Sequence, residues 1–561
     1  MIVRKTGIAA AVLALATACA IAPLTPDPSA TAPRLEGFGH VGMMVTTRSP
    51  EAQALFEQGM EQAYAFNGAE ARRAFKAALA RDPDCAMCAW GMAWQMGPNI
   101  NEPERGDLTD ARRYAAYAAN HATSATPRER ALIAALQLRY AEGSQARDAA
   151  VENAAICAPG SGGDKPPNPL DVAYAKALRQ LIDQYPDDPD VLSFYAEAEL
   201  IATPGDNWDR VTGKPMGNIG FLADRLDAAL AHHADHTGLN HYMIHTVDDV
   251  HNAARAVAAS DRLGALAPRS PHLLHMPAHI YVQVGRYADA TQVNTLALAA
   301  DDAEDAELKA QGFKPSKDWR GHNGHFQWYG ALMEGRGDMA LAIARRIASH
   351  AGQHANEYAD YQRSLTLITL VRLARWDAVL AEPPLEGTAM ATLMGQSARG
   401  TALARKGRVD EAVAALALVT PAVQQTVKKH SSQDLFDKAL RGIAQASEAR
   451  LRAEIALARH QWPEALAQQK LAVAAADDAD RLEPPYLGAG ARLALAEMQM
   501  EAQRYGDAEQ SLRTELALRA QSGWALTALV KSLDAQGRQS EAAPVRVAAA
   551  KAWPQADASL R

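Results

Sequence analysis

Residues 52–85 read AQALFEQGMEQAYAFNGAEARRAFKAALARDPDC, and this stretch decides the fold class. Small residues stand where two antiparallel helices must come close, at Gly59, Ala71 and Ala78. Phe75 is large enough to fill the remaining space, and Pro83 ends the second helix because it lacks a backbone N–H. The stretch therefore predicts a pair of antiparallel helices that repeats about every 34 residues.

The same pattern recurs along the chain wherever a tight turn precedes an alanine. Further turns of this kind begin at Gly285, Gly335, Gly407, His460, Gln503 and Gly537. Weaker matches end near Ala177, Ala256 and Val379. We therefore predict about ten helical pairs, each of which packs on its neighbours.

This spacing resembles the tetratricopeptide-repeat (TPR) superfamily over most of residues 50–550. The resemblance implies an all-α fold, a right-handed superhelical TPR solenoid of about ten helical pairs with irregular insertions. We expect the largest insertions at residues 143–169, 203–217 and 301–317, which are rich in glycine, proline or charge.

The predicted organisation has a processed start and three groups of repeats. Its segments are a signal peptide (1–18), a tether (19–35), N-terminal pairs (36–142), a loop (143–169), central repeats (170–345) and C-terminal repeats (346–561). The net charge is −8, without a basic block, whereas phosphate backbones require clustered lysine and arginine. Nucleic acid is therefore not an expected partner.

The first residues have the layout of a secretory signal. Arg4 and Lys5 precede the short apolar run 7–16, and small residues lead to Cys19. Residues 15–19, LATAC, resemble a bacterial lipobox, which implies acylation of Cys19 and an outer-membrane lipoprotein facing the periplasm. The alternative is a soluble periplasmic protein, exported by the same signal.

Four cysteines are too few for a disulfide scaffold. Cys85 and Cys88 are spaced for a local disulfide, with redox chemistry and metal binding as alternatives. Cys157 is then left without an assigned role.

The histidines follow the phase of the repeat. In the TPR superfamily, positions 2, 5, 9 and 12 of each first helix line the concave groove. That phase places groove residues on three consecutive first helices: His241, His245 and Asp248, then His272, His275 and His279, then His322, His325 and Tyr329. The two His-x-x-x-His pairs are one repeat apart, so all four imidazoles are expected to face one hollow.

Paired imidazoles on neighbouring helices suit a transition-metal ion, with His241, His245, His275, His279 and His325 as candidate ligands. Nitrogen ligands favour zinc, copper, nickel or iron over calcium and magnesium. Asp248 is a candidate metal ligand, a partner that orients a histidine ring, or a catalytic general base. The alternatives to a metal site are a groove that hydrogen-bonds a peptide and a purely structural histidine network.

Residues 236–245 (HTGLNHYMIH) and 272–281 (HLLHMPAHIY) resemble a recurring group of exported bacterial TPR proteins, as do residues 82–91 (DPDCAMCAWG). The resemblance implies a shared architecture and carries no established activity. Trp90 and Trp94 fall at groove positions of the second repeat, so they either line the groove or pack beneath the segment around His40.

The sequence thus predicts an exported TPR protein whose central histidine-rich pocket binds a transition metal. It leaves open whether that metal makes the protein a metalloenzyme, and it names no substrate. The alternative is a lipid-anchored scaffold that binds a peptide or partner protein in its groove without metal.

Overall fold

The computed structural model describes residues 24–101, 107–141, 167–203, 205–315, 319–352, 356–480, 482–488 and 490–560. Within these ranges the chain forms helices joined by turns, and the one extended pairing is an isolated bridge between Trp208 and Pro215. The predicted all-α fold class is confirmed. The predicted signal peptide, Cys19 and Cys157 lie outside the described residues.

The N-terminal helices are α1 (Pro50–Tyr64), α2 (Gly68–Arg81), α3 (Ala86–Met96), α4 (Thr109–Asn120), α5 (Pro127–Arg139), α6 (Pro169–Gln184), α7 (Pro189–Ala202) and α8 (Ile219–Leu230), with a 3-10 turn at Ala122–Ser124. The central helices are α9 (Thr237–Val247), α10 (Val257–Leu266), α11 (Pro271–His275), α12 (Pro277–Gln283), α13 (Tyr287–Ala310), α14 (Arg320–Met333) and α15 (Gly337–Ala351), with a 3-10 turn at Ala253–Ala256. The C-terminal helices are α16 (Glu357–Arg372), α17 (Trp376–Ala381), α18 (Ala389–Arg405), α19 (Val409–Lys429), α20 (Leu435–Ala458), α21 (Trp462–Ala479), α22 (Ala491–Glu501), α23 (Tyr505–Leu518), α24 (Gly523–Ala535) and α25 (Gln539–Ala552).

These helices form twelve consecutive pairs in the described part of the chain, from α1–α2 to α24–α25, when α11 and α12 are taken as one first helix. About ten pairs were expected. The pairs that carry no tight-turn signal are α3–α4 and α7–α8, whose helices are joined by residues 97–108 and 203–218. These long connections replace the tight turn before an alanine by which most of the other pairs are recognised in the sequence.

The charged stretch 301–317 differs from expectation. It was predicted as an insertion between repeats, but α13 continues through it as far as Ala310. Gly312 and Pro315 are the first helix breakers after the start of this charged run. The extension is held by tertiary packing, since Leu308 is buried in the core of the N-terminal half.

Close helix packing around Phe75 explains why the repeat requires small residues. A Cβ built on Gly59 would lie 2.6 Å from the Phe75 ring, and one built on Gly91 would lie 2.7 Å from the same ring. Phe75 is fully buried, so two glycines on α1 and α3 enclose one aromatic side chain. Each helix thus approaches the next through a residue that has no side chain.

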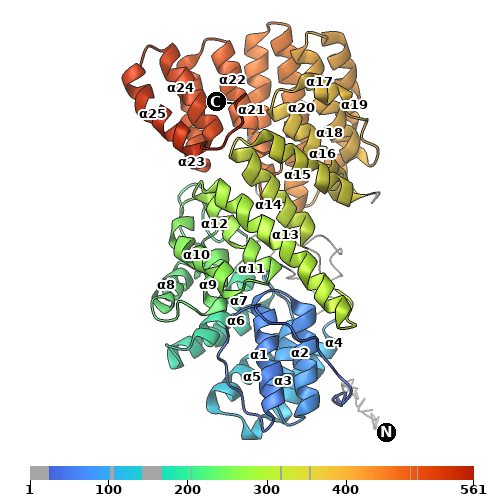
Figure 1. Ribbon diagram of the computed structural model, residues 1–561, viewed down its shortest axis with the longest axis vertical. Helices are drawn as coiled ribbons and strands as arrows, with labels where there is room; N and C mark the ends of the chain where they lie inside the picture. The colour runs from blue at the N-terminus through green and yellow to red at the C-terminus, as the bar shows by residue number, and fades with distance from the viewer. Residues whose placement is uncertain are drawn as a thin grey trace, which may run out of the picture.

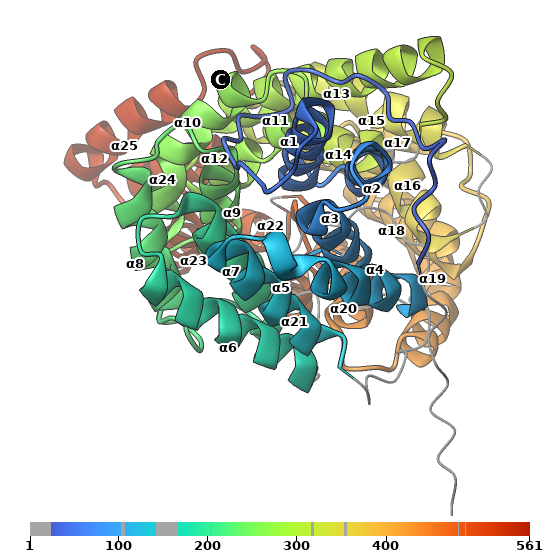
Figure 2. The same ribbon diagram turned by 90° about the horizontal axis from the view of Figure 1, so that it is seen from below.

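The repeats stack along the long axis of the molecule, with α1–α5 at one end and α16–α25 at the other (Figure 1). Seen along that axis, the helices curve around rather than stacking in a straight line (Figure 2). The chain also folds back on itself, because Trp553 donates a hydrogen bond of 2.8 Å to the carbonyl oxygen of Met333. The C-terminal repeats therefore lie against the central ones.

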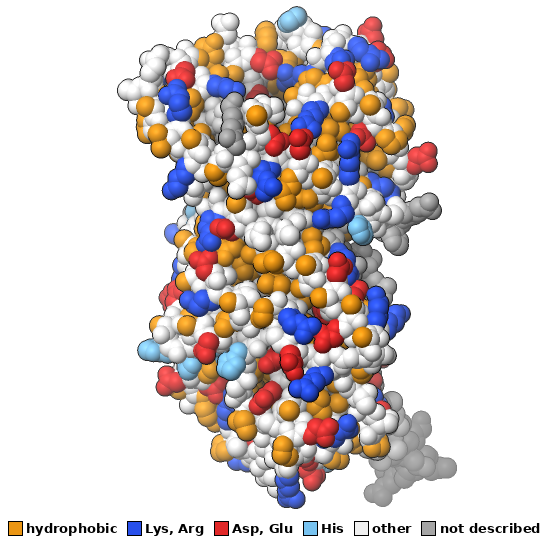
Figure 3. All heavy atoms as spheres, in the orientation of Figure 1, with side chains coloured by type: hydrophobic (Ala, Val, Ile, Leu, Met, Phe, Trp, Pro, Cys, Tyr) orange, Lys and Arg blue, Asp and Glu red, His pale blue; other side chains and the backbone are white. Residues whose placement is uncertain are grey.

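The face of the molecule drawn in Figure 3 shows no field of one charge. On the face drawn in Figure 3, acidic and basic side chains are interspersed with apolar ones. Among the described helices, none combines the length and the apolar character that crossing a bilayer requires.

The packing of Phe75 predicts that Gly59→Ala is destabilising by about 1–3 kcal/mol, because the ring is held on its other side by Gly91 and has nowhere to move. Gly506→Ala is the matched control, since a Cβ there meets no atom within 4 Å and the site is in α23. It should be neutral or stabilising by up to about 1 kcal/mol. Thermal melting of the two variants measures the difference, and equal melting temperatures would contradict the packing argument.

Candidate metal centre

Six histidines meet where the first helices of three consecutive central repeats lie side by side. They come from α9, α11, α12 and α14 and are His241, His245, His272, His275, His279 and His322. Their exposed fractions range from 0% to 5%, so they are not the lining of an open groove. Their nitrogens form two groups of three, whereas the sequence predicts that the histidines share one site.

The first triad consists of His241, His245 and His272. Nε2 of His241 lies 3.1 Å from Nε2 of His245 and 3.1 Å from Nε2 of His272. Nδ1 of His241 lies 2.7 Å from the carbonyl oxygen of Tyr64. A carbonyl oxygen only accepts hydrogen bonds, so Nδ1 carries the proton and Nε2 presents a lone pair to the triad.

Aromatic rings close the first triad. The ring of Phe66 lies 4.5 Å from that of His241 and 5.0 Å from that of His272, and Trp319 covers His272 at 4.4 Å. Phe66 has a φ of 53° in the turn after α1, where Gly285 and Gly335 have φ values of 79° and 71° in their own turns. A large residue in the left-handed region is costly, and here it supplies the cover of the triad.

The second triad consists of His275, His279 and His322. The helix is interrupted at Met276, and α12 begins at Pro277, yet Nε2 of His275 still lies 3.0 Å from Nε2 of His279. Nδ1 of His275 donates to Oδ1 of Asn294 at 2.7 Å, and the Asn294 amide nitrogen is itself committed to the Ala290 carbonyl. His322 completes the group, with all three ligand nitrogens within 4.8 Å of one another.

Two carboxylates hold His279 from its outer side. Nδ1 of His279 lies 2.8 Å from Oδ2 of Asp248 and 2.9 Å from Oε2 of Glu483. Carboxylates accept this proton, so Nε2 of His279 also presents a lone pair inward. Burial, together with the charge of Asp248, raises the pKa of Glu483 to about 8.

The second triad borders a cavity of about 400 Å³. The wall of this cavity is mostly acidic and apolar, and includes Asp248, His279, Phe326, Tyr329, Asp480 and Glu483. Asp480 and Glu483 come from the end of α21 and the segment that follows it, so the C-terminal repeats close the cavity over the central ones. Among the triad histidines, His279 is the one that reaches the cavity wall.

Burial lowers the pKa of four of these imidazoles and so favours their neutral form. It lowers the pKa of His241 to about 3, and it lowers those of His245, His275 and His322 well below the usual value. Neutral imidazole is the form that binds metal ions.

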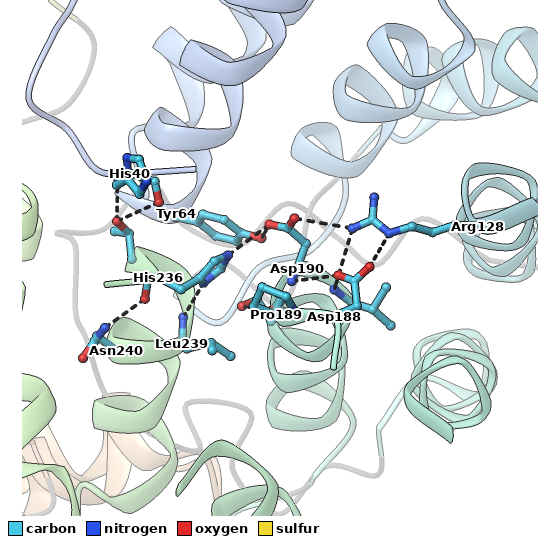
Figure 4. A network of polar contacts seen from close by, with 12 residues as sticks. His40, Tyr64, Arg128, Asp188, Pro189, Asp190, His236, Leu239 and Asn240 are labelled. Carbon is cyan, nitrogen blue, oxygen red and sulfur yellow. Dashed lines mark hydrogen bonds and ion pairs between the residues drawn. The ribbon is translucent and has the colours of Figure 1, made fainter. Parts of the chain in front are cut away.

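A polar network fixes α9 and α1 relative to each other (Figure 4). His236 caps α9 by accepting a hydrogen bond from the Leu239 N–H, and its Nε2 lies 3.1 Å from Oδ1 of Asp190. The Tyr64 hydroxyl donates to the same oxygen at 2.9 Å. Burial opposes ionisation of Asp190, but the His236 contact holds its pKa below the usual value. The carbonyl of Tyr64 thereby stays in place for His241.

The structure places three histidines differently from the predicted ligand set. His325 was expected as a ligand, but its Nε2 lies 2.7 Å from the Tyr361 hydroxyl and it belongs to neither triad. His322 and His272, expected only as neighbours, are members of the triads. The physical reason is that the rings are packed between helices, so the side chains near the start of α11 and α14 point toward the preceding helix.

The other groove candidates are placed as follows. Tyr329 lies in the wall of the acidic cavity. Trp90 and Trp94 are buried in the N-terminal core, where their ring nitrogens donate to the Leu132 carbonyl and to Glu197. Cys85 and Cys88 form a disulfide at the start of α3.

Sequence reasoning missed Glu483, Asn294 and the cover provided by Phe66. Glu483 lies 204 residues after its partner His279 in the sequence. It belongs to a stretch outside the repeat pattern. Asn294 is on α13, a second helix, where groove positions are not sought. The one available signal was Phe66, a large aromatic residue at a turn position where four other repeats have glycine, at Gly285, Gly335, Gly407 and Gly537.

No protein-family model and no curated protein matches the sequence. Among solved structures, the crystal structure of yeast Tom70 aligns over 89% of this chain and 91% of its own, at 12% identity and a TM-score of 0.25. A likeness at that level carries no argument about fold or function.

Burial of His325 predicts a dependence of stability on pH. Its pKa is lowered to about 3, against about 6.5 in an unfolded chain. Below about pH 6.5 the unfolded chain binds a proton that the folded chain does not, so stability falls as the pH falls, by about 1.4 kcal/mol per unit. His325→Gln should reduce this slope by that amount between about pH 6 and 4.

Urea unfolding of the metal-free protein at a series of pH values measures the slope. Tyr361→Phe is the control, because it removes the hydrogen-bond partner and leaves the imidazole buried, so the slope should remain. An unchanged slope in His325→Gln would contradict the prediction.

Proposed function

We propose that the two histidine triads bind transition-metal ions, and that the second triad serves the acidic cavity as its reactive centre. The observation that carries this proposal is the direction of the ring nitrogens. Nδ1 of His241, His275 and His279 is in each case committed as a donor to an oxygen, so each Nε2 turns a lone pair inward.

Lone pairs that face each other need a positive charge between them. Nε2 of His275 and Nε2 of His279 are 3.0 Å apart and both are acceptors. A shared proton satisfies two nitrogens, but it leaves no place for the third ring, and Nε2 of His322 is buried without a hydrogen-bond partner in the described structure. A metal ion accommodates all three rings at metal–nitrogen distances of about 2.0–2.1 Å.

The outer contacts of the rings are those of metal-bound histidines. A metal-bound histidine uses one ring nitrogen for the metal and donates the N–H of the other to a carboxylate, a carbonyl or a comparable oxygen. This contact fixes the tautomer and raises the basicity of the ligand. Tyr64 supplies a backbone carbonyl, Asn294 an amide oxygen, and Asp248 with Glu483 a pair of carboxylates. Asp248 therefore has the role of an orienting partner, and its place in the cavity wall also suits a general base.

Nitrogen ligands favour zinc, copper, nickel or iron. Three protein nitrogens leave at least one coordination position for water or substrate, the arrangement of catalytic rather than structural sites. At the second triad that position is beside the acidic cavity, where a metal ion with carboxylates nearby is suited to activating water. Recognition of a peptide by the imidazoles themselves is disfavoured, because all six are buried.

The proposal includes export, with Cys19 as the lipid anchor on the outer membrane and the repeats in the periplasm. The signal-like start and the lipobox-like residues 15–19 support it. The disulfide between Cys85 and Cys88 also supports it, because disulfides persist in oxidising compartments.

Metal analysis of protein purified without a histidine tag tests the main proposal. We expect one ion in each triad, with His241→Ala removing the ion of the first triad and His275→Ala that of the second. His325→Ala is the matched control, since it also removes a buried imidazole but one outside both triads. Protein that stays metal-free and gains no thermal stability from zinc, copper, nickel or iron would overturn the proposal in favour of a metal-free scaffold.

The carboxylate pair predicts a separate effect. Glu483→Gln should lower the metal affinity of the second triad by roughly 10–100-fold while the first triad is unaffected, because it weakens the contact that orients His279. Glu464→Gln, which changes an exposed glutamate on α21, should change neither affinity. Competition with a chelator measures both values, and equal affinities in the two variants would show that Glu483 has no part in the site.

A further inference from the structure

A second cavity lies in the C-terminal repeats, among the first helices α16, α18 and α20, which pack in succession in the upper part of Figure 1. Its volume is about 80 Å³. Most of its wall is apolar, with Leu367, Val371, Met394 and Leu487 among the lining residues. Leu487 and Gly490, from between α21 and α22, form one side of it. The cavity shares no lining residue with the acidic cavity that borders His279.

One positive side chain in this wall has no partner. Arg450, on α20, makes no hydrogen bond or ion pair with any described residue, and its Nε is buried. The neighbouring arginines are already engaged, Arg372 with Glu497 and Arg405 with Glu454. Burial lowers the pKa of Arg450 below its usual value, although Glu454 acts in the opposite direction. Arg450 is partly buried, and a guanidinium nitrogen shielded from water without a hydrogen-bond acceptor is costly unless a ligand supplies one.

Hydroxyl groups line the same cavity as Arg450. Ser397 is 8% exposed, lines the cavity from α18, and its Oγ is buried without a hydrogen-bond partner in the described structure. Thr401, one turn further along α18, and Ser447 on α20 also line the cavity. The cavity thus combines an unused guanidinium and an unused hydroxyl with an apolar wall.

We infer that this cavity binds a small monocarboxylate with an apolar body, its carboxylate on Arg450 and Ser397 and its hydrocarbon against α16 and α18. The guanidinium fork matches a carboxylate in geometry and charge. Ligands of higher charge are disfavoured, because Glu454 and Glu497 are close enough to act on Arg450 and would repel them. By volume, the cavity has roughly six times the space that one buried water needs, which suits a short-chain acid.

Titration calorimetry of the full chain with pentanoate tests this site, with pentanamide as the neutral ligand of the same shape. We expect saturable binding of pentanoate to one site and at least tenfold weaker binding of pentanamide. Arg450→Gln should weaken pentanoate binding at least tenfold, and Ser397→Ala should weaken it by a smaller factor. Arg452→Gln, which changes an arginine paired with Glu448 on the outer side of the same helix, should have no effect.

The variants are expected to fold, because Arg450→Gln removes a buried charge and breaks no ion pair; circular dichroism and the melting temperature check this directly. The inference is overturned if pentanoate does not bind saturably, if pentanamide binds equally well, or if Arg450→Gln binds like the unaltered chain. The site is independent of the histidine triads, so metal-free and metal-loaded protein should give the same result.

Discussion

The hydrogen bond from Nδ1 of His241 to the carbonyl oxygen of Tyr64 sets the direction in which the first triad can act. It joins α1 to α9 across 177 residues, so the first repeat and the central repeats are positioned by the same contact that fixes a tautomer. The aromatic cover of the triad depends on it as well, since Phe66 is two residues after Tyr64, in the turn that follows α1. The contact that holds α1 against α9 is therefore also the contact that fixes the tautomer of His241.

The two triads differ in what surrounds them. The first is enclosed by Phe66 and Trp319 and is oriented by a backbone carbonyl, an environment suited to holding an ion permanently. The second has two carboxylates behind His279 and a cavity beside it. In the proposed function, this carboxylate pair also offsets the positive charge of a buried cation. Three neutral imidazoles without a carboxylate do not offset that charge. Reactivity is thus assigned to the second triad.

The short segment between α21 and α22 contributes residues to both cavities. It contributes Glu483 to the acidic cavity and Leu487 to the apolar one, while Tyr486 between them stacks on Tyr361 at 4.3 Å. A segment without helical structure, held by aromatic packing, thus supplies the wall of both candidate sites. Such connections carry function in helical repeats because the repeats themselves are committed to packing.

The sequence alone determined most of the helical pairs, their phase and the gathering of histidines on neighbouring first helices, because small residues and a fixed period decide local packing. The pairs α3–α4 and α7–α8 were found only in the structure. It left open how the histidines divide, and it placed His325 rather than His322 in the site. Only the tertiary structure decided these points, together with the arrival of Glu483 and the burial of Arg450. The curvature of the superhelix brings distant segments together, and it accumulates over many repeats from small rotations that no single repeat encodes.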